Sequence, residues 1–164
     1  MAKKLQASDE FLELMRKGSM CIALANNTQI TLDGTYGNTK VPLDSNVYNY
    51  SKRNVFSLYD NGIKVSKAGR YLVSGNIMMT ASNSSMTVIG TIRRKRASNS
   101  AYSRLSSGYM RLSASNGWLS LGLTPYPIYL EAGDIIYLCV GGSSAETVNV
   151  GGASAYTYLT ITEL

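Results

Sequence analysis

The chain of 164 residues contains no histidine. Imidazole is the usual general base near neutral pH and a common metal ligand, so this absence excludes histidine-based catalysis and histidine-ligated metal sites. Cysteine is scarce as well, because Cys21 and Cys139 are the only thiols. Two cysteines do not make a disulfide framework, and whether they pair is left open. Cys139 lies in an apolar segment, where a small buried thiol is the simplest interpretation.

Long apolar runs are also missing. No stretch approaches the roughly 20 residues that a membrane-spanning helix needs. Residues 1–6 lack the apolar core of a signal peptide, so we expect a protein made in a cytoplasm with no membrane association. Charged residues make up only 16 % of the chain, while apolar residues make up 45 %, which excludes a disordered polymer.

The elements of an active site are not visible either. The ten acidic residues are scattered along the chain, without a paired-cysteine motif or a nucleophile elbow. The pairs Gly141-Gly142 and Gly151-Gly152 are not followed by the Gly-Lys-Ser/Thr of a phosphate-binding loop. We therefore expect a protein that is not an enzyme and that uses neither a metal nor a cofactor.

Tyrosine, by contrast, is abundant, with twelve residues against two phenylalanines. Short apolar and aromatic segments alternate with turns rich in Gly, Asn and Ser, which predicts an all-β sandwich or jelly roll. The expected strands are Met20–Ala25, Gln29–Leu32, Phe56–Tyr59, Arg70–Met79, Ser85–Arg94, Tyr109–Ser113, Trp118–Leu123, Pro127–Leu130, Ile135–Val140 and Ala155–Ile161. Turns are expected at Asp60-Asn61-Gly62, Ala97–Ser100, Ser115-Asn116-Gly117, Ala132-Gly133 and Gly141-Gly142. Residues 33–54 read as a polar connection with Val41, Leu43 and Val47 as apolar plugs.

Three segments resemble a known family. Phe56 is followed by a glycine-ending spacer and by Gly69-Arg70-Tyr71; Leu130-Glu-Ala-Gly-Asp134 precedes an apolar strand; and Ser154–Thr162 closes the chain with alternating tyrosines. In this order they resemble the trimeric jelly rolls of the complement globular-head and tumour necrosis factor type. The resemblance implies a TNF-like antiparallel jelly roll and a homotrimer, with strands near Tyr71 and Tyr158 lining its axis. Tyr156 is a third interface candidate.

Two strands also look non-polar on both faces. In Ile135–Val140 every side chain is apolar or a tyrosine or cysteine, and in the last strand Leu159 and Ile161 alternate with tyrosines. An antiparallel strand with one wet face should alternate apolar with polar residues. We therefore expect a second covered surface, and tyrosine is well suited to a subunit interface.

Residues 1–20 differ from the expected head domain, residues 21–164. Ser8 is placed to cap a helix that ends at Gly18, with acidic residues in its first turn. Its apolar stripe is Phe11, Leu12, Leu14 and Met15. A helix this short is not stable alone, so the stripe must dock on its own sheet, on a neighbouring subunit or on another protein. The last alternative makes these four residues candidates for an anchor.

The formal net charge is +6, and no acidic residue lies between Asp60 and Glu131. The densest basic run is Arg93-Arg94-Lys95-Arg96. Alternation along a strand sends Arg93 and Lys95 to one face and the other two to the opposite face. The run can bind phosphates or an anionic polymer, discourage strand pairing at an edge, or pair with acids of a neighbouring subunit. Nucleic-acid binding is not expected as the main function, because no stacking platform is interleaved with the basic residues.

Together these features favour a non-enzymatic bacteriophage virion protein, assembled in the host cytoplasm. It would be a trimeric head fibre or capsid decoration whose N-terminal arm binds the major capsid protein or another virion protein. One alternative is a lectin-like receptor-binding tip that grips host glycans. Its ligand-binding candidates are Trp118, Tyr109, Tyr126, Arg93, Arg94, Lys95 and Arg96. A second alternative is a capsid-cementing protein that binds no host.

Overall fold

The computed structural model describes residues 17–34, 38–50, 54–81, 85–113, 115–153 and 155–164. Within these ranges the chain forms strands and no helix, which confirms the all-β prediction. The expected N-terminal helix lies outside the described residues. The strands are β1 (Ser19–Ala23), β2 (Thr28–Thr31), β3 (Thr39–Lys40), β4 (Ser45–Asn49), β5 (Phe56–Tyr59), β6 (Gly62–Val65), β7 (Gly69–Ala81), β8 (Met86–Lys95), β9 (Tyr102–Leu112), β10 (Leu119–Leu130), β11 (Ile135–Gly142), β12 (Thr147–Val150) and β13 (Tyr158–Glu163).

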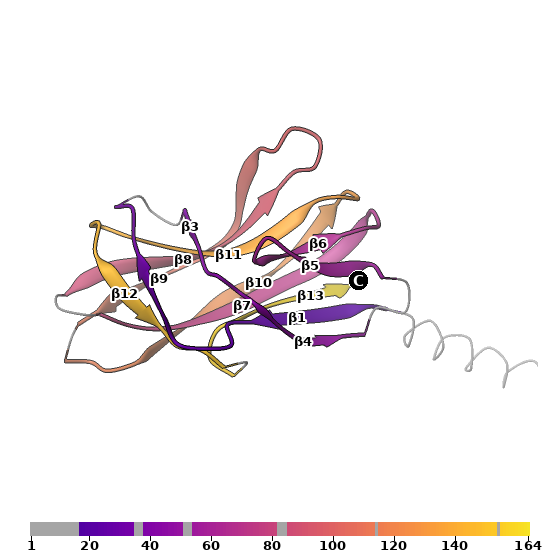
Figure 1. Ribbon diagram of the computed structural model, residues 1–164. Helices are drawn as coiled ribbons and strands as arrows, with labels where there is room; N and C mark the ends of the chain where they lie inside the picture. Colours follow the sequence, from indigo (N-terminus) through magenta and orange to yellow (C-terminus); the bar gives the residue numbers. More distant parts are fainter. Residues whose placement is uncertain (1–16, 35–37, 51–53, 82–84, 114, 154) are drawn as a thin grey trace, which may run out of the picture.

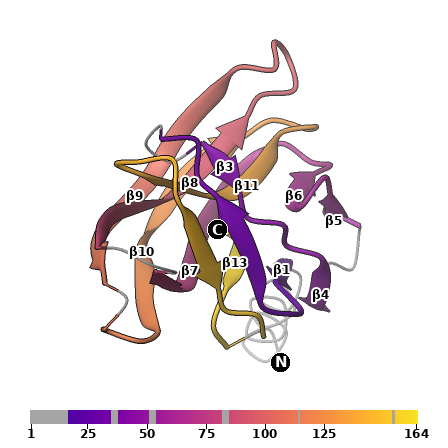
Figure 2. The ribbon, with the colours of Figure 1, turned by 60° about the vertical axis from the view of Figure 1, so that its left-hand side comes forward.

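Two antiparallel sheets pack face to face (Figure 1). Sheet A has seven strands in the order β2-β12-β7-β13-β1-β4, with β10 paired to β7. Sheet B has six strands in the order β5-β6-β11-β8-β9, with β3 paired to β11. The hairpin between β8 and β9 extends well beyond the sandwich, as Figures 1 and 2 both show.

The long strand β7 is the centre of sheet A, and its residues alternate strictly between the core and the outside. Val73, Ile77 and Met79 are fully buried. Tyr71 is buried too, with its ring edge-on to Phe56 at 5.7 Å and its hydroxyl donating to the Lys67 carbonyl at 2.6 Å. This period of two is what the sequence of the segment predicts for a half-buried strand.

Strand β11 is buried on both faces, as its sequence predicts. Its inward side chains join the main core, whereas Ile135, Tyr137 and Cys139 form a second cluster on the outer face of sheet B. Two neighbours from the same subunit lie over that cluster: Lys40 of β3 and Tyr102 of β9. Side chains of the same chain therefore cover the outer face of this strand. The expectation that its two apolar faces indicate a second subunit is corrected.

The turn between β5 and β6 has positive φ at Asp60 (50°) and Asn61 (62°), while Gly62 is not in the left-handed region. The glycine is required for another reason: a Cβ at Gly62 would lie 2.5 Å from the Ile136 carbonyl oxygen. The segment Asp60-Asn61-Gly62 thus combines two features. Asp60 and Asn61 form the tight turn, and Gly62 allows β6 to approach β11 closely.

Other expectations are corrected by the pairing of the strands. Gly141-Gly142 is the end of β11 and not a turn. The expected strands Trp118–Leu123 and Pro127–Leu130 are parts of one strand, β10, which begins at Leu119 and whose register shifts between Leu123 and Tyr126. The supposed polar connection contains β3 and β4, and its plugs Val41 and Leu43 are fully buried whereas Val47 is 42 % exposed.

The beginning of β1 and the end of β13 lie side by side. The Gly18 amide donates to Glu163 Oε2 at 2.6 Å, and the Glu163 amide donates to the Gly18 carbonyl at 2.9 Å. The turn between β9 and β10 lies at the opposite end of sheet A, because Leu119 pairs with Met79 near the end of β7. The sandwich therefore has one end that carries residues 18 and 163 and a far end that carries the β9–β10 turn.

Candidate functional site

The two sheets differ sharply in charge. Within the described residues, the seven strands of sheet A contain only two charged side chains, Arg70 and Glu163. The six strands of sheet B contain no acidic side chain. The strand register places six cations of sheet B on its outer face: Lys40, Lys64, Arg93, Lys95, Arg104 and Arg111. We call this surface the basic face.

The register also brings like charges together on the basic face. Arg93 of β8 lies directly opposite Arg104 of β9. Lys64 and Lys95 lie on either side of Ile135. Like charges directly opposite one another on a sheet are destabilising, so the register concentrates positive charge on this face at a cost to stability.

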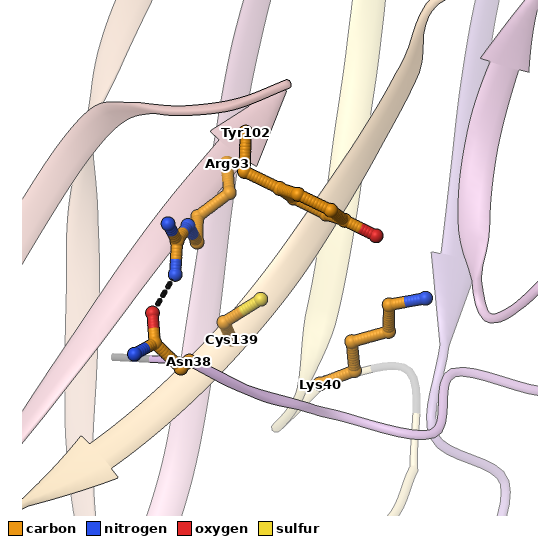
Figure 3. Close-up of a pocket in the computed structure, with 5 residues that line it drawn as sticks. All are labelled: Asn38, Lys40, Arg93, Tyr102 and Cys139. Carbon is orange, nitrogen blue, oxygen red and sulfur yellow. Dashed lines mark hydrogen bonds between the residues drawn. The ribbon is translucent and has the colours of Figure 1, made fainter. Parts of the chain in front are cut away.

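A pocket of about 270 Å³ opens on the basic face, lined by Asn38, Lys40, Arg93, Tyr102 and Cys139 (Figure 3). The Arg93 guanidinium donates from Nη1 to Asn38 Oδ1, and its Cζ lies 5.7 Å from the centre of the Tyr102 ring. Figure 3 shows Cys139 between the Arg93 and Lys40 sides of the pocket. Two cations, an amide, a phenol and a buried thiol therefore converge on one hollow.

Lys40 holds its position through two contacts. Its Nζ lies 4.1 Å from the centre of the Tyr137 ring and 2.6 Å from Asp60 Oδ2. The same carboxylate oxygen accepts a hydrogen bond from the Tyr137 hydroxyl at 3.1 Å. The hydrogen bond from Lys40, followed by that from Tyr137, lowers the pKa of Asp60. Burial, reinforced by Asp60, raises the pKa of Tyr137. Asp60 thus stays ionised and Tyr137 protonated at neutral pH.

Cys139 is a poor nucleophile in this position. It is 2 % exposed, and burial raises the pKa of its thiol to about 12. The thiolate is the reactive form of cysteine, so almost none is present at neutral pH. Cys139 and Cys21 are both free thiols, so they do not form a disulfide with each other.

Three residues of the basic run 93–96 are divided between two tasks, while Arg96 is exposed just beyond the end of β8. Arg93 and Lys95 reach the basic face, where both lie against the Tyr102 ring. Arg94 turns the other way, and its Nη2 lies 2.5 Å from Oδ2 of the fully buried Asp134. Asp134 also accepts hydrogen bonds from the Ala97 amide (3.0 Å) and the Glu131 amide (2.8 Å). Arg94 therefore ties the base of the β8–β9 hairpin to the β10–β11 turn.

The remaining ligand-binding candidates do not gather at the pocket. Tyr109 is 62 % exposed and lies on the basic face, further along β9. Tyr126 is 43 % exposed on β10 of sheet A. Trp118 is 41 % exposed at the far end, beside a separate hollow of about 160 Å³. That hollow is lined by Asn27, Thr28, Gln29, Trp118 and Asn149. A single glycan site that uses all the predicted residues is not assembled within one subunit.

The interface candidates also separate. Tyr71 is 1 % exposed and belongs to the core, because the alternation of β7 turns it inward; its assignment to a trimer axis is corrected. Tyr158 is half-buried on the outer face of sheet A, and Tyr156 is 46 % exposed in the turn before β13. The anchor candidates Phe11, Leu12, Leu14 and Met15 lie outside the described residues.

The described part of the chain offers neither a metal site nor a membrane span of the helical kind. No three His, Cys, Asp or Glu side chains there are grouped so that they could hold a metal ion. Nor do those residues include a helix of the length and apolarity needed to cross a membrane.

No protein-family model and no curated protein sequence matches the chain. Solved structures do match it. The structure of Eiger TNF from S. frugiperda superposes with a TM-score of 0.67 at 14 % identity, covering 89 % of this chain and 91 % of that one. Murine APRIL at pH 5.0 gives a TM-score of 0.66 at 14 % identity, and murine APRIL at pH 8.5 gives 0.64 at 16 %; each match covers 90 % of this chain and 99 % of the other. The chain therefore has the TNF-like jelly-roll fold that its sequence motifs resemble.

Proposed function

We propose that the chain is a non-enzymatic structural protein of a bacteriophage virion: a homotrimeric head fibre or capsid decoration that projects its jelly roll from the particle. The TNF-like fold supports a trimer through the family resemblance. The single observation that carries the proposal is the outer face of sheet A, a broad surface almost without charge.

Two pairs of polar side chains at the centre of that face are hydrogen-bonded to one another. Ser74 Oγ and Thr160 Oγ1 are 2.6 Å apart, and the Ser120 hydroxyl donates to Asn76 Oδ1 at 2.9 Å. A surface whose polar groups are satisfied internally loses little when water is removed from it. Half-buried apolar and aromatic side chains lie around these groups on the same face: Leu72, Met78, Tyr48 and Tyr158.

This composition matches the core of a protein interface, where charged residues are depleted and tyrosine is enriched. A trimer would bury the face in all three subunits and leave the basic face of each subunit outside. The virion assignment adds the expected apolar arm, which binds the major capsid protein or another virion protein while the heads project.

Assembly is tested by light scattering after gel filtration, with a matched pair of variants. Thr160→Glu places a carboxylate at the middle of the neutral face and should convert a trimer to monomers. Thr87→Glu makes the same change at an exposed position of sheet B, opposite Arg111, and should leave the trimer intact. Monomeric wild-type protein, or a trimer that survives Thr160→Glu, would refute the proposed interface.

The anchor is tested with a form that lacks residues 1–18. Because the head is expected to carry the assembly, the truncated protein should remain a soluble trimer, yet no longer join the particle in a complementation assay. Incorporation of the truncated protein at the wild-type level would refute the proposed anchor. Loss of the trimer on truncation would show that the arm, and not sheet A, holds the subunits together.

A further inference from the structure

We propose that the pocket on the basic face binds an acidic polysaccharide, by receiving one sugar residue whose acid group is a carboxylate or a phosphate. The proposal does not depend on the oligomeric state, because all five lining residues come from one subunit. Three observations support it: the chemistry of these five residues, the positive charge around them, and the cations that lie over the nearby aromatic rings.

Charge is the first argument. Arg93 presents a guanidinium held by Asn38 on one side of the pocket, and Lys40 presents an ammonium on the other. Further cations surround them, because the ammonium of Lys95 lies near the Tyr102 ring and Arg104 lies opposite Arg93. Guanidinium groups bind carboxylates and phosphates through two parallel hydrogen bonds.

Lys40 is already paired with Asp60, but this pair does not block an incoming acid group. Its two side chains are 30 % and 48 % exposed. Ion pairs that are this open to solvent contribute little to stability. A carboxylate or phosphate that enters the pocket can therefore compete with Asp60 for Lys40.

The size and lining of the pocket favour a sugar residue. Its volume of about 270 Å³ lies just below the range of roughly 300–1,000 Å³ found for drug-sized ligands. The Asn38 amide and the Tyr102 hydroxyl add neutral donors and acceptors that suit sugar hydroxyls. Cys139, buried and protonated, supplies an apolar floor.

The aromatic rings argue against nucleic acid. Single-strand binders use open aromatic faces on which bases stack. Three rings of the basic face already have cations over them: Lys40 over Tyr137 at 4.1 Å, Lys64 over Tyr59 at 5.0 Å, and Arg93 and Lys95 near Tyr102 at 5.7 and 5.9 Å. The exposed Tyr109 lies further along β9, away from the pocket. The surroundings of the pocket therefore offer charge and hydrogen bonds rather than open stacking surfaces.

The test is isothermal titration of the full-length protein with polygalacturonate and with a phosphomannan, two polysaccharides whose acid groups are carboxylates and phosphates respectively. Neutral dextran, poly-glutamate and single-stranded DNA are the comparison polymers. We expect salt-sensitive binding of at least one acidic polysaccharide, because displaced counterions weaken such binding as salt rises. Which of the two binds identifies the acid group. Binding of neither, or tighter binding of DNA or poly-glutamate, would overturn the proposal.

Three variants locate the site. Arg93→Gln should weaken binding at least tenfold. Arg70→Gln removes the same charge from an exposed position on sheet A and should change affinity less than twofold. Asp60→Asn frees Lys40 and removes a repulsive charge, so it should tighten binding; asparagine tolerates the positive φ of 50° at that position. Equal losses from Arg93→Gln and Arg70→Gln would show attraction to net charge alone, and unchanged affinity in Asp60→Asn would show that Lys40 is not part of the site; either result would overturn the proposal. Thermal unfolding of each variant confirms that it is folded.

Discussion

Replacing Arg94 by methionine removes the cation that neutralises a buried carboxylate. The Asp134 side chain is 0 % exposed and that of Arg94 11 %, with 2.5 Å between Nη2 and Oδ2. Removing one partner of such a pair costs about 3–5 kcal/mol, because the other charge stays buried and uncompensated. Asp134 would keep its hydrogen bonds from Ala97 and Glu131, so we expect about 3 kcal/mol.

The assay is thermal unfolding at one fixed protein concentration, since association makes the midpoint depend on concentration. A chain of this size loses about 2–4 °C per kcal/mol, so the midpoint should fall by about 6–12 °C. Arg96→Met is the matched control: it makes the same change two residues along, at an exposed position. Exposed substitutions usually stay within about 0.5 kcal/mol.

A second variant separates the buried charge from simple loss of packing. Combining Arg94→Met with Asp134→Asn removes the uncompensated carboxylate, so the double variant should be more stable than Arg94→Met alone. Two outcomes would refute the reasoning. One is a midpoint for Arg94→Met no lower than that of Arg96→Met. The other is a double variant that is less stable than the single variant by the full cost of Asp134→Asn.

Two further predictions follow from the buried tyrosine and thiol. Burial raises the pKa of Tyr71 to about 12, whereas an unfolded tyrosine titrates near pH ~10. The unfolded state therefore binds fewer protons above about pH 10, and the free energy of unfolding should fall as pH rises from there to 12. Urea titrations across this pH range should show a shallower fall for Tyr71→Phe than for the wild type. An identical slope in the two proteins would contradict the prediction. Burial raises the pKa of the Cys139 thiol to about 12. Its labelling by maleimide at pH 8, followed by mass spectrometry, should therefore be at least tenfold slower in the native protein than in urea. Equal rates would show that the thiol is accessible in the native protein.

The sequence predicts the fold correctly where the pattern of apolar residues in a segment matches the burial of that segment in the sandwich. The alternation in β7 and the run of apolar residues in β11 each predicted the right strand, because a period of two and a short continuous apolar segment are both typical of strands in an all-β chain. What covers the outer side of β11 could not be read, since Lys40 and Tyr102 come from segments about 100 and 35 residues away in the chain.

The candidate site was visible only in part. The absence of acidic residues between Asp60 and Glu131 signalled a basic surface, but only the strand register shows that Lys40 joins it and that Arg94 leaves it. The sequence places Asp134 in a turn but does not reveal its ion pair, because its partner Arg94 lies 40 positions earlier in the chain. Tyr71 looked like an interface residue because the family motif gives its strand, not the direction of its side chain; the parity of β7 decides that it points inward.

The adjacency of residues 18 and 163 makes the domain a candidate for circular permutation. Their mutual hydrogen bonds hold the two backbone positions together, so a short linker could join them without crossing the sandwich. New ends could be opened between the exposed residues Asn116 and Gly117, in the β9–β10 turn at the far end. The two versions of the chain would then present a fused cargo from opposite ends of the same sandwich, which turns the fold into a display scaffold that works in either direction.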